Sequence, residues 1–177
     1  GLGGTYDSTN ACGVPDVTVI AKIGFDHMAI LGDTLAKIAA EKAGIIKHGT
    51  ALVLESQEKE AMDVLNKAAE RADIKTTKVV NLDEIRILPQ KDGKQCFSYA
   101  GYDAVTMKML GVHQYENAVA AMLAAELFFE KYFAGKKNVP ELKALQHAIR
   151  EGIDRTQWMG RMELVSNDPF FLMDGAH

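Results

Sequence analysis

Short runs of apolar residues alternate with amphipathic segments in the first half of the chain. Three runs are strand candidates: Val17–Ile23, which is β-branched and typical of a buried strand, the apolar run Thr50–Leu54, and Thr77–Val80. A helix is predicted from a cap at Asp33 or Thr34 to about Ala43, with Gly44 as its end, and a second over Glu58–Ala72. Strands that alternate with helices indicate an α/β fold with a mainly parallel sheet flanked by helices.

The pattern changes to short strands over about residues 82–110. Lys91-Asp92-Gly93 is a hairpin turn signal between two strand-like runs. This region is therefore predicted to be a small antiparallel insert, formed by Ile85–Leu88, Gln95–Tyr99 and Val105–Leu110. Two further helices and two further strands are expected, and the last strand, wholly apolar, is expected to be buried. The helices are expected over Tyr115–Tyr132 and Pro140–Gly152, and the strands over Met162–Val165 and Phe170–Met173.

Composition limits the classes of protein that fit. The chain has 177 residues, enough for one domain or a large part of one, and its formal net charge is -4 without a run of Lys or Arg. These features argue against a nucleic-acid partner. No apolar stretch reaches the roughly 20 residues that cross a bilayer, and no signal peptide is visible. Cys12 and Cys96 lack metal-site spacing. We expect a cytoplasmic protein with reduced thiols and no membrane partner.

Two segments near the N-terminus have polar residues in a loop or at a strand end. Gly1–Gly4 permits close approach of a ligand to the backbone, and Asp7 follows it. A flexible Gly-rich turn is the alternative. His27 comes directly after the first predicted strand, where α/β sheets bind ligands. It could ligate a metal or orient a phosphate, or lie on a surface loop. The P-loop pattern Gly-x-x-x-x-Gly-Lys-Ser/Thr is absent from the sequence.

Lys42 lies on the apolar face of its predicted helix, because it continues the spacing of Leu35, Ile38 and Ala39. An inward Lys is costly unless it is paired or modified, and burial favours the neutral, nucleophilic amine. The alternative is a side chain that extends past the edge of the core into water.

Three later segments carry candidate ligand-binding groups. Gln114 and Asn117 stand at the start of a predicted helix, where an amide can either cap the helix or read a base edge. Arg161 follows a Gly ahead of a strand and can present its guanidinium to phosphate oxygens. Asp174 follows the last apolar run, in Asp174-Gly175-Ala176-His177.

The order of these motifs resembles the folylpolyglutamate synthase and dihydrofolate synthase family, within the Mur-ligase superfamily. The resemblance runs through the whole chain. Its motifs are Gly-x-Gly-Gly-x-x-Asp-x-Thr-Asn, Ile-Gly-x-Asp-His, Leu-Gly-x-Thr-Leu-x-x-Ile-Ala-x-Glu-Lys-Ala-Gly-Ile-x-Lys, His-Gln-x-x-Asn-Ala, Trp-x-Gly-Arg and Asp-Gly-Ala-His. The segment Ile23–Lys47 is the most specific part. The family usually has Arg where Thr5 stands, so a contact near the substrate is in doubt.

The resemblance implies roles for the candidate residues. His27 would be a magnesium ligand, and Lys42 would carry a carbamate that helps hold the metal. Asp7 would contact the pterin of the substrate. The groups around ATP would be Gln114, Asn117, Arg161, Asp174 and His177.

The resemblance also implies a domain arrangement and a reaction. Residues 1–177 would be the part of an N-terminal ATP-binding domain that follows the P-loop, and both ends look trimmed. The P-loop segment and a C-terminal glutamate-binding domain would lie outside the chain, which alone would be inactive. With ATP and Mg²⁺, the whole enzyme would join L-glutamate to a folate or dihydropteroate carboxylate through an acyl phosphate. The alternatives are a Mur-type ligase that acts on a cell-wall precursor, or a non-catalytic binding domain.

Overall fold

The structure is a computed structural model that describes residues 4, 7–25 and 32–175. The chain divides into two compact units. The first comprises Gly1–Val80 together with Ala120–Gly135, and the second comprises Asn81–Val119 together with Lys136–His177.

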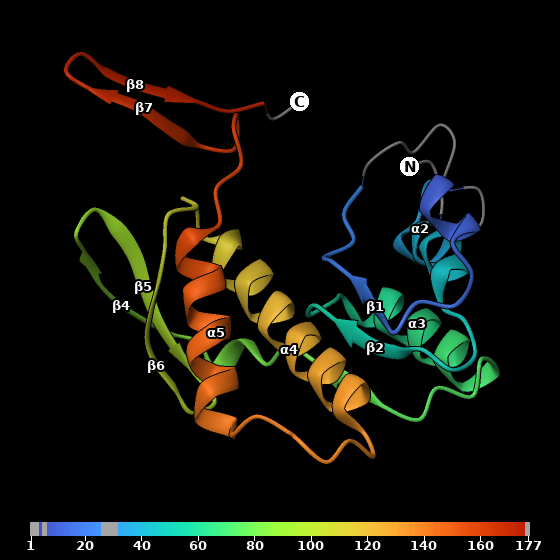
Figure 1. The fold of residues 1–177 in the computed structure, drawn as a ribbon. Helices are drawn as coiled ribbons and strands as arrows, with labels where there is room; N and C mark the ends of the chain where they lie inside the picture. The colour runs from blue at the N-terminus through green and yellow to red at the C-terminus, as the bar shows by residue number, and fades with distance from the viewer. Residues whose placement is uncertain (1–3, 5–6, 26–31, 176–177) are drawn as a thin grey trace. The chain divides into compact units, whose positions relative to one another are not determined.

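The first unit contains a parallel sheet whose strands are joined through helices (Figure 1). The sheet order is β1-β2-β3, so each strand lies beside the next one along the chain. The elements are η1 (Ser8–Ala11), β1 (Val17–Ile20), α2 (Leu35–Lys42), η2 (Ala43–Ile45), β2 (Ala51–Leu54), α3 (Lys59–Arg71) and β3 (Thr77–Val79). The predicted α/β class with a mainly parallel sheet is confirmed.

The bounds of α2 follow from local chemistry. Thr34, one of the two expected caps, has an extended backbone, and its side chain accepts a hydrogen bond from the Lys37 N–H. The other end differs from the prediction. Gly44 does not stop the helix in a left-handed turn, because the chain tightens into the 3-10 turn η2 and becomes extended only at Ile46. The segment after Lys42 therefore stays close to the end of α2.

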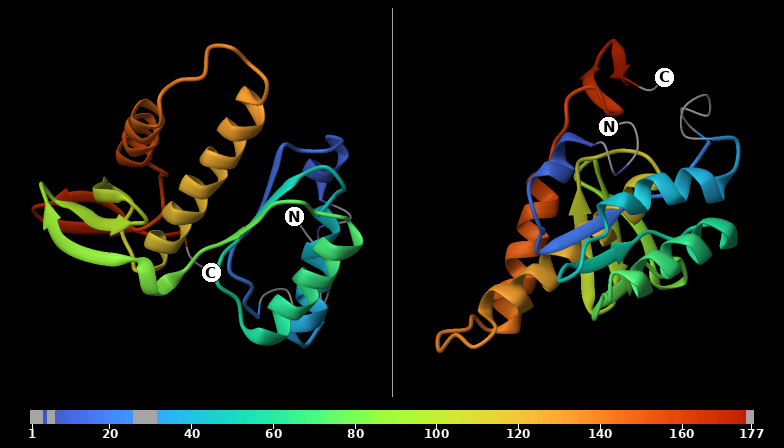
Figure 2. Two further views of the ribbon diagram at one scale, coloured as in Figure 1. Left: turned by 90° about the horizontal axis from the view of Figure 1, so that it is seen from below. Right: turned by 90° about the vertical axis from the view of Figure 1, so that its right-hand side faces the viewer.

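Helices cover both faces of the parallel sheet. Leu52 and Leu54 point to one face, where they pack in a core with residues such as Ile38 and Leu65. These two residues belong to α2 and α3, the helices that lie along that side of the sheet (Figure 2). Lys78 of β3 pairs in register with Val53, so both side chains point to the opposite face. Lys78 forms an ion pair with Glu126 at 3.0 Å. This ion pair places the later part of α4 (His113–Phe133) on that second face.

The second unit contains a three-stranded antiparallel sheet of order β4-β5-β6. Its elements, with the hairpin described below, are η3 (Leu82–Glu84), β4 (Arg86–Lys91), β5 (Lys94–Tyr99), β6 (Tyr102–Met107), the start of α4, α5 (Leu142–Arg155), β7 (Glu163–Asn167) and β8 (Phe170–Met173). Asp92 and Gly93 join β4 to β5 with φ of 53° and 74°, the pair of positive φ values that a tight hairpin turn requires. The antiparallel part of the predicted fold class is confirmed.

A polar cluster holds α5 against the antiparallel sheet. The Lys94 ammonium donates to both carboxylate oxygens of Asp154, at 2.6 and 2.8 Å, and the Thr106 hydroxyl donates to one of them at 2.6 Å. Hydrogen bonds from Lys94 and from Thr106 hold the pKa of Asp154 below its ordinary value. This cluster fixes the end of α5, which leads directly into the segment that carries Arg161.

The hairpin of β7 and β8 corrects one expectation. The apolar run Phe170–Met173 does form a strand, paired antiparallel with β7. All four of its residues are exposed, and Phe170 retains 71% of its accessible surface. The prediction of a buried strand is therefore wrong. A run of apolar residues favours burial, but it does not show that another element of the same chain covers it.

Among the residues that the structure describes, no helix combines the length and apolar character needed to cross a membrane.

Candidate functional site

In the first unit, Gly4 is docked on the end of α2 by a close backbone contact. The Gly4 N–H donates to the Glu41 carbonyl oxygen at 2.7 Å. A Cβ atom on Gly4 would lie 2.7 Å from the carbonyl oxygens of both Glu41 and Lys42, closer than real Cβ atoms approach. The Asp7 N–H in turn donates to the Gly4 carbonyl at 3.3 Å. Glycine at position 4 therefore lets the loop reach α2 and carries Asp7 with it.

Asp7 and Lys42 line the same cavity at the carboxyl end of β1. The cavity has a volume of about 200 Å³, and its other walls include Gly4, Lys22 and Ile45. Lys42 is half-buried and continues the helix face of the fully buried Ile38. The structure thus brings together two residues that lie far apart in the sequence. It combines a carboxylate and an amine where open α/β sheets bind their ligands. His27 lies outside the described residues.

Two side chains after β2 hold the backbone that follows β1, and the sequence patterns did not single them out. The buried Glu55 carboxylate accepts from the Lys22 N–H at 2.6 Å. The Gln57 side chain accepts from the Ile23 N–H at 2.8 Å and donates to the Ala21 carbonyl at 3.1 Å. The backbone of residues 21–23 thus bonds to side chains and not to a neighbouring strand, and β1 ends at Ile20. The sequence signal that could have found these two residues is a carboxylate or an amide just after a buried strand.

In the second unit, the start of α4 presents a pair of amides. The Asn117 side chain donates to the Gln114 side-chain oxygen at 3.0 Å, and Gln114 also contacts the His113 ring at 3.2 Å. Tyr115 anchors this turn by packing edge-to-face on Phe97, with ring centroids 5.7 Å apart. Burial raises the pKa of the Tyr115 hydroxyl, which stays neutral. Gln114 and Asn117 are thus coupled to each other on a fixed helix end.

The loop before α4 depends on a buried residue that the sequence reasoning missed. The Gln95 side chain, on β5, donates to the carbonyl oxygens of Met109 at 2.7 Å and Gly111 at 3.2 Å. Gly111 has φ of +109°, and a Cβ there would lie 3.0 Å from the Met162 sulfur. The loop that leads to Gln114 is therefore close to the residue that follows Arg161. The sequence signal that could have found Gln95 is a polar residue within a buried strand.

Arg161 and Asp174 lie at the open end of the β7–β8 hairpin. The Asp174 carboxylate accepts from the Met162 N–H at 3.4 Å, and the Gly175 N–H donates to the Gly160 carbonyl at 2.6 Å. Antiparallel pairing of Glu163 with Met173 continues this contact into the hairpin. The structure therefore joins the segment that carries Arg161 to the segment that carries Asp174. His177, the last candidate, lies outside the described residues.

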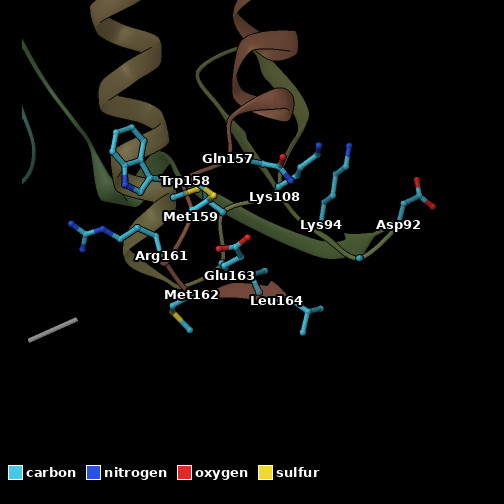
Figure 3. A pocket seen from close by; sticks show the side chains of 13 residues that line it. Asp92, Lys94, Lys108, Gln157, Trp158, Met159, Arg161, Met162, Glu163 and Leu164 are labelled. Carbon is cyan, nitrogen blue, oxygen red and sulfur yellow. The ribbon is translucent and has the colours of Figure 1, made fainter. Parts of the chain in front are cut away.

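A cavity of about 390 Å³ adjoins Arg161, between the hairpin turn of β4 and β5 and the start of β7 (Figure 3). Arg161 and Lys94 extend from opposite ends of it in this view, and Trp158 lies near Arg161. Trp158 is 70% exposed, so its ring is available to a planar ligand. Lys94 is already paired with Asp154, so Arg161 and the exposed Trp158 ring are the groups here that suit a ligand with an anionic part and a flat part.

Within the described ranges, no three side chains of His, Cys, Asp or Glu gather into a metal cluster. Mg²⁺ often binds through only one or two protein oxygen groups and keeps several waters. The cavity that Asp7 and Lys42 line has room for such an open arrangement.

Comparison with known proteins agrees with this architecture. The Mur ligase middle domain matches residues 4–125. The dihydrofolate synthase/folylpolyglutamate synthase of Bacillus subtilis is 37% identical over 185 aligned residues, which cover the whole of this chain and 40% of that protein. A folylpolyglutamate synthase of Arabidopsis thaliana is 35% identical, again over the whole chain but only 30% of the relative. The chain thus spans less than half the length of these relatives.

Solved structures show the same fold. An FPGS–AMPPCP complex has a TM-score of 0.84 and 26% identity, and it covers all of this chain and 43% of that one. The Mycobacterium tuberculosis folylpolyglutamate synthase complexed with ADP has a TM-score of 0.79 and 30% identity, covering 100% of this chain and 39% of that one. The resemblance drawn from the motifs is confirmed. Since the middle-domain match spans well over half of the sequence, the chain belongs to the Mur ligase family, and within it resembles the folylpolyglutamate and dihydrofolate synthases.

Proposed function

We propose that the chain is part of an ATP-dependent ligase that adds L-glutamate to the carboxylate of a folate or dihydropteroate. The observation that carries this proposal is the shared cavity of Asp7 and Lys42 at the carboxyl end of β1. The relatives that match the whole chain are folylpolyglutamate synthases, and one matching structure is an FPGS–AMPPCP–folate complex. AMPPCP is an ATP analogue, which supports ATP as the nucleotide.

We assign the cavity of the first unit to the metal and the acceptor substrate. Lys42, as a carbamate, and His27 would hold Mg²⁺, and Asp7 would contact the substrate ring. The position of Lys42 in the wall of this cavity supports this role, because CO₂ can reach an amine there and form a carbamate with it. When bound, Mg²⁺ would offset the charge of the triphosphate.

We assign the cluster of the second unit to ATP. The buried Gln114 holds the half-buried Asn117, whose amide can bind a base or ribose, and the Arg161 guanidinium can bind phosphate oxygens. Asp174, joined to the same backbone segment as Arg161, and His177 complete the proposed set. Of this set, Gln114, Asn117, Arg161 and Asp174 lie at or beside a strand end or helix end that the fold already holds.

The proposed reaction has two steps. A carboxylate oxygen of the acceptor attacks the γ-phosphorus of ATP, ADP leaves, and an acyl phosphate forms. The amine of L-glutamate then attacks the acyl carbon, phosphate leaves, and an amide bond remains. The main barrier in the first step is repulsion between a carboxylate and a triphosphate, so cations such as Arg161 would act electrostatically.

We propose that the 177 residues correspond to the part of an ATP-binding domain that follows the P-loop, with residues 82–110 as an insert. A P-loop motif is absent from the sequence, so the chain alone is expected to show no turnover. A cytoplasmic location stays a prediction.

The test is incorporation of L-glutamate by the full-length gene product with Mg-ATP and either dihydropteroate or tetrahydrofolate, with the 177-residue chain as the control. Incorporation by the full-length protein alone supports the proposal and names the acceptor. Turnover by the chain alone contradicts the proposed domain organisation. Failure with both acceptors overturns the folate assignment, and a cell-wall acceptor or a non-catalytic domain would then be tested next.

Lys42 has a matched control on its own helix. Lys37 is exposed and pairs with Asp33 at 2.7 Å, away from the cavity. Lys42→Met is expected to lower kcat by roughly a hundredfold or more because a charge-stabilising group is lost, whereas Lys37→Met leaves it unchanged. Wild-type activity should also fall in CO₂-free buffer and return with bicarbonate. Insensitivity to CO₂ would contradict the carbamate.

A further inference from the structure

The ammonium of Lys47 binds the loop that carries Asp7 at positions that follow Asp7 in the chain, whereas the contact of Gly4 precedes it. Its Nζ donates to the carbonyl oxygen of Asn10 at 2.6 Å and to that of Gly13, also at 2.6 Å. Lys47 ends the most specific motif of the sequence, yet the proposed reaction gives it no role. We propose that Lys47 is a positioning residue that fixes this loop, and through it Asp7, for binding of the acceptor substrate.

The loop has two attachment points on the segment that runs from α2 through η2. Gly4 is fixed to the end of α2 by its close contact with Glu41 and Lys42. At the other end, Lys47 binds two carbonyls, and the Asn10 side chain donates to the Gly44 carbonyl at 3.4 Å. Asp7 lies between these points in the chain. Its position in the cavity therefore depends on both attachments.

Apolar packing contributes little to holding this loop. Residues 11–16 are all exposed. A second cavity of about 200 Å³ separates the loop from β1, and its walls include Cys12, Val17 and Ile45. A segment with little apolar packing depends on its polar contacts to stay ordered. The two bonds from Lys47 are short and charge-assisted, and such bonds are stronger than those between neutral groups.

The path from Lys47 to Asp7 is a single 3-10 turn. The Asn10 N–H donates to the Asp7 carbonyl at 2.9 Å across η1. When Lys47 holds the Asn10 carbonyl, it therefore holds the turn that begins at Asp7. Lys47 lines the cavity beneath the loop, whereas Asp7 lines the candidate substrate cavity. Lys47 thus acts through the loop and is not expected to touch the substrate.

This inference rests on the proposed function for its kinetic test, and a second measurement is independent of activity. In the full-length protein, Lys47→Met removes the donors and keeps most of the apolar stem. The KM for the acceptor is expected to rise roughly tenfold, which corresponds to about 1.4 kcal/mol of lost binding. The KM for ATP should change less than about twofold, because ordering of this loop affects one substrate. Lys47→Arg, whose guanidinium can donate to both carbonyls, should restore most of the acceptor affinity.

The second measurement uses a nitroxide label on Cys12, which lies inside the loop and is exposed, while Cys96 is buried and stays unlabelled. In the 177-residue chain, Lys47→Met is expected to sharpen the spectrum of the label as the loop gains motion. Lys59→Met is the matched control, because Lys59 is an exposed lysine of the same unit whose ion pair with Asp63, at 2.9 Å, lies within α3. It should leave both the label and the acceptor KM unchanged.

The outcomes separate the two proposals. If the wild-type full-length protein transfers no glutamate, the proposed function fails, and the label at Cys12 still decides whether Lys47 orders the loop. An unchanged spectrum in Lys47→Met overturns the positioning role. So does a variant in which both KM values rise together, as a general loss of structure would produce. If Lys47→Met does not fold, Lys47→Gln, which keeps one neutral donor group, is measured in the same two ways.

Discussion

The fully buried Leu52 and Leu54 of β2 contrast with β8, a strand as short and as apolar in which all four residues are exposed. The parallel sheet of the first unit has helices on both faces, whereas the β7–β8 hairpin has no covering element among the described residues of its own unit. The candidate groups share this difference. Lys42 stands on a helix that belongs to a core, and Arg161 and Asp174 stand at the end of an exposed hairpin.

The two clusters are consequently positioned by different forces. Around Lys42 the fold uses burial and close backbone contact, as at Gly4. Around Arg161 and Asp174 it uses hydrogen bonds between adjacent backbone segments, and a polar cluster at Asp154 fixes the helix that precedes them. If this comparison is right, substitutions in the first unit should affect folding strongly, and substitutions near the hairpin should affect it little.

The largest effect is expected from Leu65, which is fully buried between α3 and the sheet. Leu65→Ala should lower the free energy of unfolding by about 3 kcal/mol, since a buried leucine leaves both a transfer loss and a cavity. Phe171→Ala, at a side chain that is 55% exposed, should change it by less than about 0.5 kcal/mol. Urea denaturation of the chain measures both. Equal effects would contradict the view that β8 is uncovered.

A second substitution tests the close contact of the glycine loop. Gly4→Ala should cost about 1–3 kcal/mol, because the new Cβ meets backbone atoms that cannot move aside as a side chain can. Gly24→Ala is its control, since a Cβ there would have open space and the residue does not have a positive φ. Thermal denaturation of the two variants compares them. A Gly4→Ala protein as stable as Gly24→Ala would show that the loop is not docked on α2.

The alternation of strands and helices in the first unit could be predicted from the sequence because it reflects local periodicity. Thr34 as a cap and Asp92-Gly93 as a turn followed from local chemistry in the same way. The exposure of Phe170–Met173 could not be predicted, because a run of apolar residues carries no information on what packs against it.

The contacts of the polar residues that hold the sites could also not be predicted from the pattern of apolar and polar residues. Lys47, Glu55 and Gln95 act on backbone groups of other segments, and nothing in their neighbouring residues names those partners. Asp7 and Lys42 were named from the motifs, but only the fold shows that they line one cavity. The roles of the candidate residues stay predictions until they are tested in the full-length protein.

A smaller effect is expected at Asp154, whose pKa is held down by hydrogen bonds from Lys94 and Thr106. Its carboxylate stabilises the fold above its unfolded pKa of about 3.9, and this contribution is lost as the pH falls through the lower folded value. Asp154→Asn should therefore cost about 1 kcal/mol at pH 7, an amount that allows for partial solvent screening, and progressively less as the pH falls through the lowered folded pKa. Asp33→Asn, at an exposed pair with Lys37, is the control and should not shift the unfolding midpoint. A pH-independent cost at Asp154 would show that its charge is not involved.

The smallest effect on folding is expected from Asp174→Asn. The asparagine oxygen can still accept the Met162 N–H, and the residue is exposed, so the free energy of unfolding should change by less than about 0.5 kcal/mol. In the full-length protein the same change removes a negative charge from the proposed ATP cluster and should alter the kinetic constants for ATP. Ser166→Ala, on the exposed hairpin, is a control for both measurements because its hydroxyl bonds only within the turn, to Asp168. A stability loss without a kinetic effect would make Asp174 a structural residue of the hairpin. An effect on ATP kinetics alone would show that this exposed hairpin is kept for ligand binding, whereas the core beneath Lys42 serves folding and binding together.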